Sequence, residues 1–140
     1  NYHDGLTERV DQTTGARYVP VGYVDAMERA YAAADLMLAR SGAGTVVEVA
    51  TVGLPAIMVP LPIGNGEQAR NAKPLVDASA AICIDDAELT ADRLVSEVTA
   101  LFAAPGKLAA MSAAAQKLMR PDAAARVAHV VLDAAQAGER

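Results

Sequence analysis

The sequence predicts an α/β fold in which helices cover both faces of an open parallel sheet. Two patterns support this prediction. Short apolar runs alternate with stretches of helical spacing along the 140 residues, which is the order expected of a doubly wound sheet. The apolar runs also lack the apolar–polar alternation of a half-exposed strand, so they are typical of parallel strands buried on both faces. We expect residues 1–16 to be a lead-in segment and residues 17–140 to form one incomplete domain of this type.

Four apolar runs have the length of strands, and the best defined is bounded by Pro55 and Pro60. Pro20 places the first run at a strand end or a sheet edge. The four predicted strands are residues 18–21, 36–39, 56–59 and 81–84.

The helices are predicted from apolar spacing and from their end signals. Gly53 ends the second helix, Thr90 caps the fourth, and Pro105 and Pro121 precede the last two. In the last helix Val127, Val130, Val131 and Ala134 recur at helical spacing, so we expect them to face inward. The predicted helices are residues 24–34, 45–52 and 67–78, followed by three more that begin after residues 90, 105 and 121.

Composition excludes several classes of function. The net charge of -5 and the pI near 4.9 provide no basic field, so we expect no nucleic-acid partner. A single cysteine excludes an internal disulfide. No catalytic serine–histidine–aspartate set is present, and Asp85 and Asp86 are typical of a solvated turn rather than a metal site. We therefore expect no metal and no catalytic residue in this chain.

The motif RSGAGT at residues 40–45 lies between a predicted strand and a predicted helix. Its small residues, Ala43 and Gly44 among them, let backbone N–H groups approach an anion at the helix start, and Ser41 and Thr45 add hydroxyl donors. A plain strand-to-helix turn explains the motif better when it is taken alone. Glu48 follows Thr45 at the spacing of a capping box, and spacing alone favours that role.

The segment PLPIGNGEQARNA at residues 60–72 brings Glu67 and Gln68 to the start of a helix, with Asn71 one turn later. Adjacent carboxylate and amide groups suit a ligand rich in hydroxyls, such as a sugar. An acidic residue that complements the helix dipole is an equally good interpretation.

Three segments together resemble the C-terminal half of the MurG family of peptidoglycan N-acetylglucosaminyltransferases. They are YVDAM (23–27), AADLMLARSGAGTVVEVATVGLPAIMVPLP (33–62) and NGEQARNA (65–72). Members of that family have the two-domain GT-B fold, whose C-terminal half is Rossmann-like. They transfer N-acetylglucosamine from UDP-GlcNAc to lipid I, giving lipid II. The resemblance therefore implies binding of UDP-GlcNAc without a cofactor.

The resemblance also implies roles for individual residues. The backbone of Val24 would contact the uracil edge, and Glu48 would hold the ribose hydroxyls, which replaces the capping interpretation. Amides at the start of the second helix would meet the sugar and the diphosphate, while Glu67 and Gln68 would contact the N-acetylglucosamine hydroxyls and Asn71 would lie nearby. The positions of those amides are Ala43, Gly44 and Thr45.

Two residues depart from the family pattern. Gly44 stands where a larger apolar residue is frequent, and Glu67 stands where some members have glutamine. Glu67 keeps an acceptor but lacks amide donors, so its sugar contact is less secure than that of Gln68.

The resemblance further implies that the N-terminal acceptor domain is absent, so this chain would bind donor without completing transfer by itself. The full enzyme would reach lipid I through that domain, at the cytoplasmic side of the bacterial plasma membrane, whereas this chain would be soluble and prone to self-association. Two alternatives stay open. One is a domain of a UDP-GlcNAc 2-epimerase, and the other is a non-catalytic α/β interaction module.

Overall fold

The computed structural model describes residues 6–119 and 122–138, which fall into two compact units, Asn1–Ala33 and Ala34–Arg140. The first unit contains an antiparallel pair, β1 (Arg9–Val10) with β2 (Arg17–Tyr18), followed by α1 (Met27–Ala33). The turn between β1 and β2 is closed by Asp11, whose Oδ1 accepts the backbone N–H groups of Thr13 and Thr14 at 2.8 and 2.9 Å. These hydrogen bonds, that from Thr14 above all, hold the pKa of the Asp11 carboxyl below its ordinary value.

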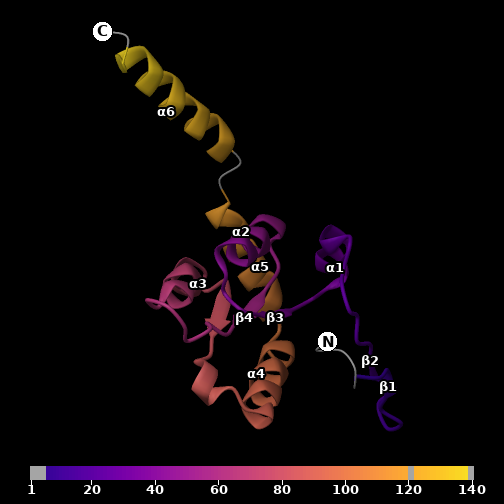
Figure 1. Cartoon of the computed structure of the whole chain (residues 1–140). Helices are drawn as coiled ribbons and strands as arrows, with labels where there is room; N and C mark the ends of the chain where they lie inside the picture. The colour runs from indigo at the N-terminus through magenta and orange to yellow at the C-terminus, as the bar shows by residue number, and fades with distance from the viewer. Residues whose placement is uncertain (1–5, 120–121, 139–140) are drawn as a thin grey trace. The chain divides into compact units, whose positions relative to one another are not determined.

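The second unit contains three strands and the remaining helices, in the alternating order that the sequence predicts (Figure 1). Its elements are β3 (Met37–Ala39), α2 (Ala43–Val52), β4 (Ala56–Met58), α3 (Glu67–Asp77), β5 (Ala81–Cys83), the short 3-10 helix η1 (Asp86–Glu88), α4 (Ala91–Ala103), α5 (Lys107–Leu118) and α6 (Ala123–Gly138).

The three strands form a parallel sheet in the order β3-β4-β5. Ile57 in the central strand is in register with Leu38 on one side and Ile82 on the other. The ladder continues beyond the strands, since the Val59 N–H donates to the Ala39 carbonyl at 2.9 Å. Because all three strands run in one direction, their carboxyl ends lie at the same edge of the sheet.

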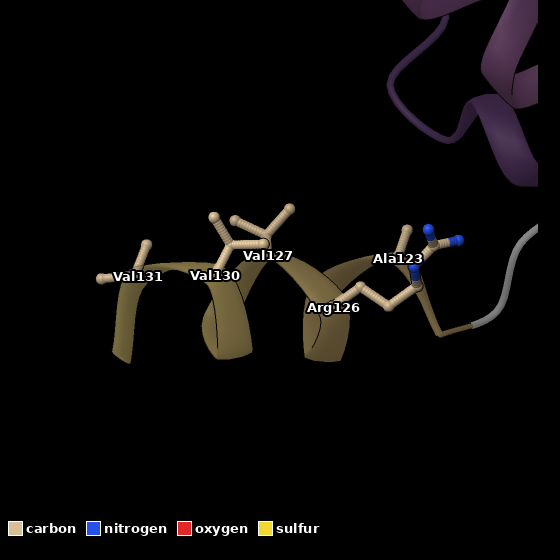
Figure 2. Close-up of a pocket in the computed structure, with 5 residues that line it drawn as sticks. All are labelled: Ala123, Arg126, Val127, Val130 and Val131. Carbon is tan, nitrogen blue, oxygen red and sulfur yellow. The ribbon is translucent and has the colours of Figure 1, made fainter. Parts of the chain in front are cut away.

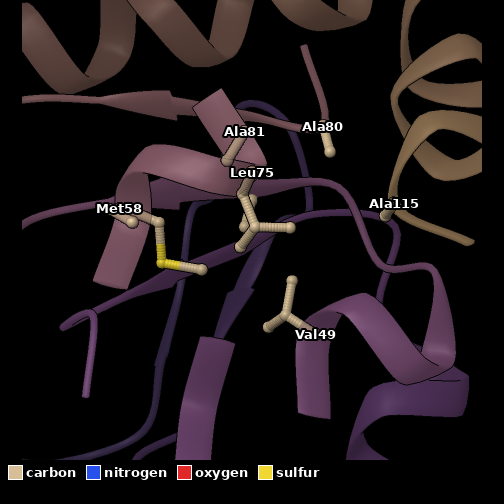
Figure 3. Close-up of a cluster of buried hydrophobic side chains, with 8 residues drawn as sticks. Val49, Met58, Leu75, Ala80, Ala81 and Ala115 are labelled. Atoms are coloured by element: carbon tan, nitrogen blue, oxygen red, sulfur yellow. The ribbon is translucent and has the colours of Figure 1, made fainter. Parts of the chain in front are cut away.

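Helices cover both faces of this sheet, as predicted. Successive residues of β4 point to opposite faces, so Ala56 and Met58 enter one hydrophobic cluster while Ile57 enters the other. The first cluster is shown in Figure 3, where the side chains of Val49, Met58 and Leu75 point toward one another. Its buried members are Val49, Ala56, Met58, Ala72, Leu75, Ala80, Ala81 and Ala115. The second cluster consists of Ile57, Val59, Ile84, Leu101 and Met111.

The prediction for the segment 18–21 is wrong. We expected a fourth strand of the parallel sheet, but Arg17–Tyr18 pairs with Arg9–Val10 in an antiparallel hairpin of the first unit. Val19 and Val21 are both more than half exposed. A local hairpin partner only a few residues away competes with a distant sheet, because closing a short loop costs less chain entropy.

The prediction for α6 is also wrong. Its apolar residues recur at helical spacing, yet Val127, Val130 and Val131 are 64%, 68% and 61% exposed, and Ala134 is exposed as well. Figure 2 shows the three valines projecting from the helix beside Ala123. Apolar periodicity indicates which face of a helix would pack against a partner, but it does not say where that partner is.

In the described part of the chain, no single helix is long and apolar enough to span a membrane. One bent combination that begins with α4 meets the criteria of length and hydropathy only when its parts are counted together.

Candidate functional site

Two of the predicted motifs meet at the carboxyl edge of the sheet. The RSGAGT motif follows β3 and the segment 60–72 follows β4, so parallel pairing of these strands brings both to the same edge. Ser41 makes the direct connection, because its fully buried Oγ donates to the carbonyl of Gln68 at 2.8 Å. The Nδ2 of Asn71 donates in return to the Ser41 carbonyl at 3.2 Å. Ser41, Gln68 and Asn71 are thus joined in one network.

The amide of Gln68 has a fixed orientation. Its Oε1 accepts the backbone N–H of Leu61 at 3.0 Å. Since that N–H is a donor, the atom facing it is the amide oxygen, and Nε2 points elsewhere as a donor. Gln68 is half-buried, and within the described residues its Nε2 remains available to a ligand that offers a lone pair.

The first turn of α2 presents backbone donors. Its N-cap is Gly42, which supplies no side-chain cap, and the first helical hydrogen bond runs from the Val46 N–H to the Gly42 carbonyl at 3.0 Å. The N–H groups of Ala43, Gly44 and Thr45 therefore have no intrahelical acceptor. Nothing lies within 4 Å of where a side chain on Gly44 would begin, so the helix surface beside this residue is unobstructed.

The capping interpretation of Thr45 and Glu48 is wrong. A capping box needs Thr45 at the N-cap, but α2 begins two residues earlier, at Ala43. Thr45 instead lies within the first turn and is half-buried, and Glu48 is exposed one turn later. Residues three apart lie on one side of a helix, so the Glu48 carboxylate and the Thr45 hydroxyl share a face of α2.

Glu67 is the first residue of α3 and is exposed. Gly66 precedes it at the N-cap with φ of +70°, a conformation that costs glycine least, and provides no side-chain cap. Glu67 therefore lies where a carboxylate complements the helix dipole. That position is compatible with ligand contact as well, since the side chain faces solvent.

Val24 belongs to the first unit, where it is half-buried in the loop before α1. The other eight predicted site residues all belong to the second unit.

Sequence reasoning missed an ion pair at the same edge. Arg40 follows β3 directly, and its Nη1 pairs with the Asp86 carboxylate and donates to the Val59 carbonyl at 3.2 Å. We expected Asp86 to lie in a solvated turn, but it is engaged by Arg40. The sequence did contain a signal for this ion pair: Arg40 and Asp86 have opposite charges, and each closely follows a predicted strand of the parallel sheet.

The loop after β4 and the residues after β5 enclose a cavity of about 260 Å³. Its lining is apolar except for two carboxylates. The lining residues are Pro60, Leu61, Pro62, Gly66, Ala69, Asp85, Asp86 and Ala87. Among the described residues, no group of three or more histidine, cysteine or carboxylate side chains is arranged to bind a metal ion.

Cys83, the last residue of β5, is an exposed thiol near this edge. Partial burial raises the pKa of Cys83, and the charge of Asp85 raises it further. A raised pKa keeps the thiol protonated at neutral pH, which makes a nucleophilic role unfavourable.

Residues 3–127 match the model of the glycosyltransferase family 28 C-terminal domain. The chain belongs to this family. The match covers all nine predicted site residues and ends within α6. The resemblance to MurG that the sequence motifs indicated is confirmed by the relatives.

Curated relatives of this chain carry the name UDP-N-acetylglucosamine–N-acetylmuramyl-(pentapeptide) pyrophosphoryl-undecaprenol N-acetylglucosamine transferase, among them proteins from Cutibacterium acnes and Mycolicibacterium smegmatis. The one from Cutibacterium acnes is 56% identical over 131 residues, which is 94% of this chain and 35% of the relative. The one from Mycolicibacterium smegmatis is 56% identical over 123 residues, or 88% of this chain and 32% of the relative. The chain thus spans about a third of the length of these relatives.

The crystal structure of Acinetobacter baumannii MurG has the same fold over most of this chain. The TM-score is 0.73 at 32% sequence identity, covering 81% of this chain and 34% of the MurG chain. This similarity confirms the predicted α/β fold class and its place in the C-terminal part of a GT-B enzyme.

Proposed function

We propose that this chain is the donor-binding part of an inverting N-acetylglucosaminyltransferase that uses UDP-GlcNAc and forms lipid II from lipid I. The observation that carries the proposal is the hydrogen bond between Ser41 and Gln68. It joins the start of α2, with open backbone donors, to the start of α3, where Gln68 presents an amide donor. A nucleotide sugar needs both, since its diphosphate is an anion and its sugar is rich in hydroxyl acceptors. Relatives named for this transfer support the choice of ligand.

In the proposed complex the diphosphate lies at the start of α2, at the N–H groups of Ala43, Gly44 and Thr45. Glu48, one turn along the same face, accepts hydrogen bonds from the ribose hydroxyls. The family resemblance assigns the contact with the uracil edge to the backbone of Val24, in the first unit.

The sugar lies against α3. Gln68 donates from Nε2 to a sugar hydroxyl, because its Oε1 is committed to Leu61. Glu67 accepts from another hydroxyl. Asn71 supports the loop through Ser41 and does not need to contact the ligand.

The proposed reaction is a direct displacement at the anomeric carbon, with inversion and with UDP as the leaving group. Negative charge grows on the diphosphate as the bond to the sugar breaks. Fixed backbone donors at a helix start stabilise such charge without reorganising. The binding site for the acceptor lipid I, and the group that removes the acceptor's proton, belong to the remaining two thirds of the full-length relatives. The transfer takes place at the cytoplasmic side of the plasma membrane.

Calorimetric titration of the chain with UDP, UDP-GlcNAc and ADP tests the proposal. We expect both uridine nucleotides to bind and ADP not to bind. Glu48→Ala should weaken UDP and UDP-GlcNAc alike, because both contain the ribose. Asp92→Ala is the matched control, because Asp92 is also an exposed carboxylate on a helix. Its helix, α4, packs on the opposite face of the sheet from α2.

Equal binding of ADP and UDP would contradict uridine recognition. Binding of neither, also in a chain extended to the length of the relatives, would favour a non-catalytic interaction module. Formation of UDP-N-acetylmannosamine by the extended chain would instead indicate a 2-epimerase.

A further inference from the structure

The Arg40 side chain links the carboxyl ends of all three strands. Arg40 follows β3, donates to the Asp86 carboxylate just after β5, and donates to the Val59 carbonyl just after β4. The side chains of Arg40 and Asp86 are 46% and 33% exposed, so the pair lies at the surface of the edge rather than in the core. No ligand-contacting role has been assigned to either residue above.

Arg40 and Gln68 are connected by two paths of hydrogen bonds and short backbone segments, which together form a closed ring. One side of the ring runs from Arg40 to its neighbour Ser41, whose Oγ donates to the Gln68 carbonyl at 2.8 Å. The other side runs from Arg40 through the Val59 carbonyl and along the chain to Leu61, whose N–H donates to Gln68 Oε1 at 3.0 Å. Both the backbone and the side-chain amide of Gln68 are therefore fixed by the same ring.

Asp86 holds the Arg40 side chain in this ring from a third segment of the chain, the one that follows β5. Without its charge, the half-exposed guanidinium gains more from hydration than from one bond to a carbonyl, and Arg40 would leave Val59 for solvent. The side of the ring that passes through Val59 would then open. The segment from Val59 to Leu61 would keep the bond from the Val59 N–H to the Ala39 carbonyl but lose one of its two hydrogen bonds at Val59. The Leu61 N–H, and with it the Gln68 amide, would be less tightly positioned.

We propose that Asp86 is a positioning residue for the donor sugar, acting through Arg40 to orient Gln68; this inference rests on the function proposed above. The ring ends at the residue that faces the sugar, whereas Glu48 and the first turn of α2, which face the nucleotide, are outside it. Loss of the Asp86 charge therefore changes the contact with the sugar and leaves the contacts with UDP intact.

The test compares the affinities of UDP-GlcNAc and UDP for Asp86→Asn, measured by calorimetry on the full chain. Asp85→Asn is the matched control, because Asp85 is the neighbouring carboxylate on the same cavity and does not pair with Arg40. For Asp86→Asn we expect UDP-GlcNAc to bind about two- to fivefold more weakly, the range set by a partly exposed ion pair, with UDP unchanged. Asp86→Glu keeps the charge and should recover most of the loss.

A double-mutant cycle shows whether Asp86 acts through Arg40. In an Arg40→Gln chain, Asp86→Asn should produce no further loss of UDP-GlcNAc affinity. Thermal unfolding of each variant identifies any general destabilisation, which would weaken UDP and UDP-GlcNAc equally.

The outcomes separate the two proposals. If the unaltered chain selects uridine nucleotides but Asp86→Asn matches Asp85→Asn, or weakens both ligands equally, the positioning role is overturned and the donor site stands. If neither the unaltered chain nor a chain extended to the length of the relatives selects uridine nucleotides, the proposed function is overturned and the positioning role with it.

Discussion

The hydrogen bond from Ser41 to Gln68 provides a direct test of how the loop before α2 is joined to the start of α3. Ser41→Ala removes the Oγ and leaves the rest of the side chain in place. Ser41 has no exposed surface, so water cannot replace the lost donor without a rearrangement. The substitution should therefore lower the free energy of unfolding.

The size of the decrease in stability depends on which hydrogen-bond donors the Gln68 carbonyl retains after Ser41→Ala. Gln68 lies in the first turn of α3, where its carbonyl also accepts the ordinary helical N–H from four residues later. The acceptor is thus not left without a donor, and the full penalty for an unsatisfied buried group does not apply. The remaining cost is that of one net hydrogen bond, about 1 kcal/mol, which corresponds to a decrease in Tm of roughly 2–6 °C.

Urea denaturation followed by circular dichroism measures this change. Ser96→Ala is the control, because Ser96 is exposed on α4 and the same chemical change there should alter the free energy by no more than about 0.5 kcal/mol. If the two variants unfold at the same urea concentration, the Ser41 hydroxyl does not stabilise the joint between the loops, and the argument from this hydrogen bond is refuted.

Three further predictions concern the elements around the site. Gly53→Ala should lower the free energy of unfolding by about 1–3 kcal/mol, because φ is +70° at this residue and the new Cβ would lie 2.6 Å from Gln116 Cγ. Adding Gln116→Ala should recover only the part of the loss that is due to this steric contact. Full recovery of stability in urea denaturation would contradict the argument from the backbone conformation. Thr90→Ala should cost about 1 kcal/mol by removing the N-cap of α4, and an unchanged denaturation midpoint would exclude that role. At pH 8 Cys83 should react with iodoacetamide more slowly than glutathione does, since its raised pKa lowers the thiolate fraction, and Asp85→Asn should accelerate the reaction; a rate unaffected by Asp85→Asn would exclude the charge effect.

Local signals in the sequence were sufficient for the helix ends. The structure confirms that Gly53 ends α2 in the left-handed conformation and that the Thr90 side chain caps α4. These signals succeed because a cap depends on the conformation and donors of a few neighbouring residues, which are present whatever the rest of the chain does.

Signals that depend on a distant partner were less informative. The apolar run at 18–21 was compatible with a sheet strand, and a hairpin partner took part of it instead. The valines of α6 follow helical spacing correctly, yet they are exposed in the structure. The local sequence pattern could not prevent either error. Apolar periodicity indicates the type of secondary structure and its apolar face, but it does not identify the part of the chain that covers this face.

The sequence by itself determined the α/β class, the three parallel strands, the family motifs and the residues that they nominate for donor binding, although only β4 is buried along its whole length. Only the tertiary structure decided how those residues are connected. The links between Ser41 and Gln68 and between Arg40 and Asp86 join residues 27 and 46 positions apart. Such pairs meet because parallel strands bring their carboxyl ends to one edge, and the register that aligns them is a property of the folded sheet rather than of any local segment.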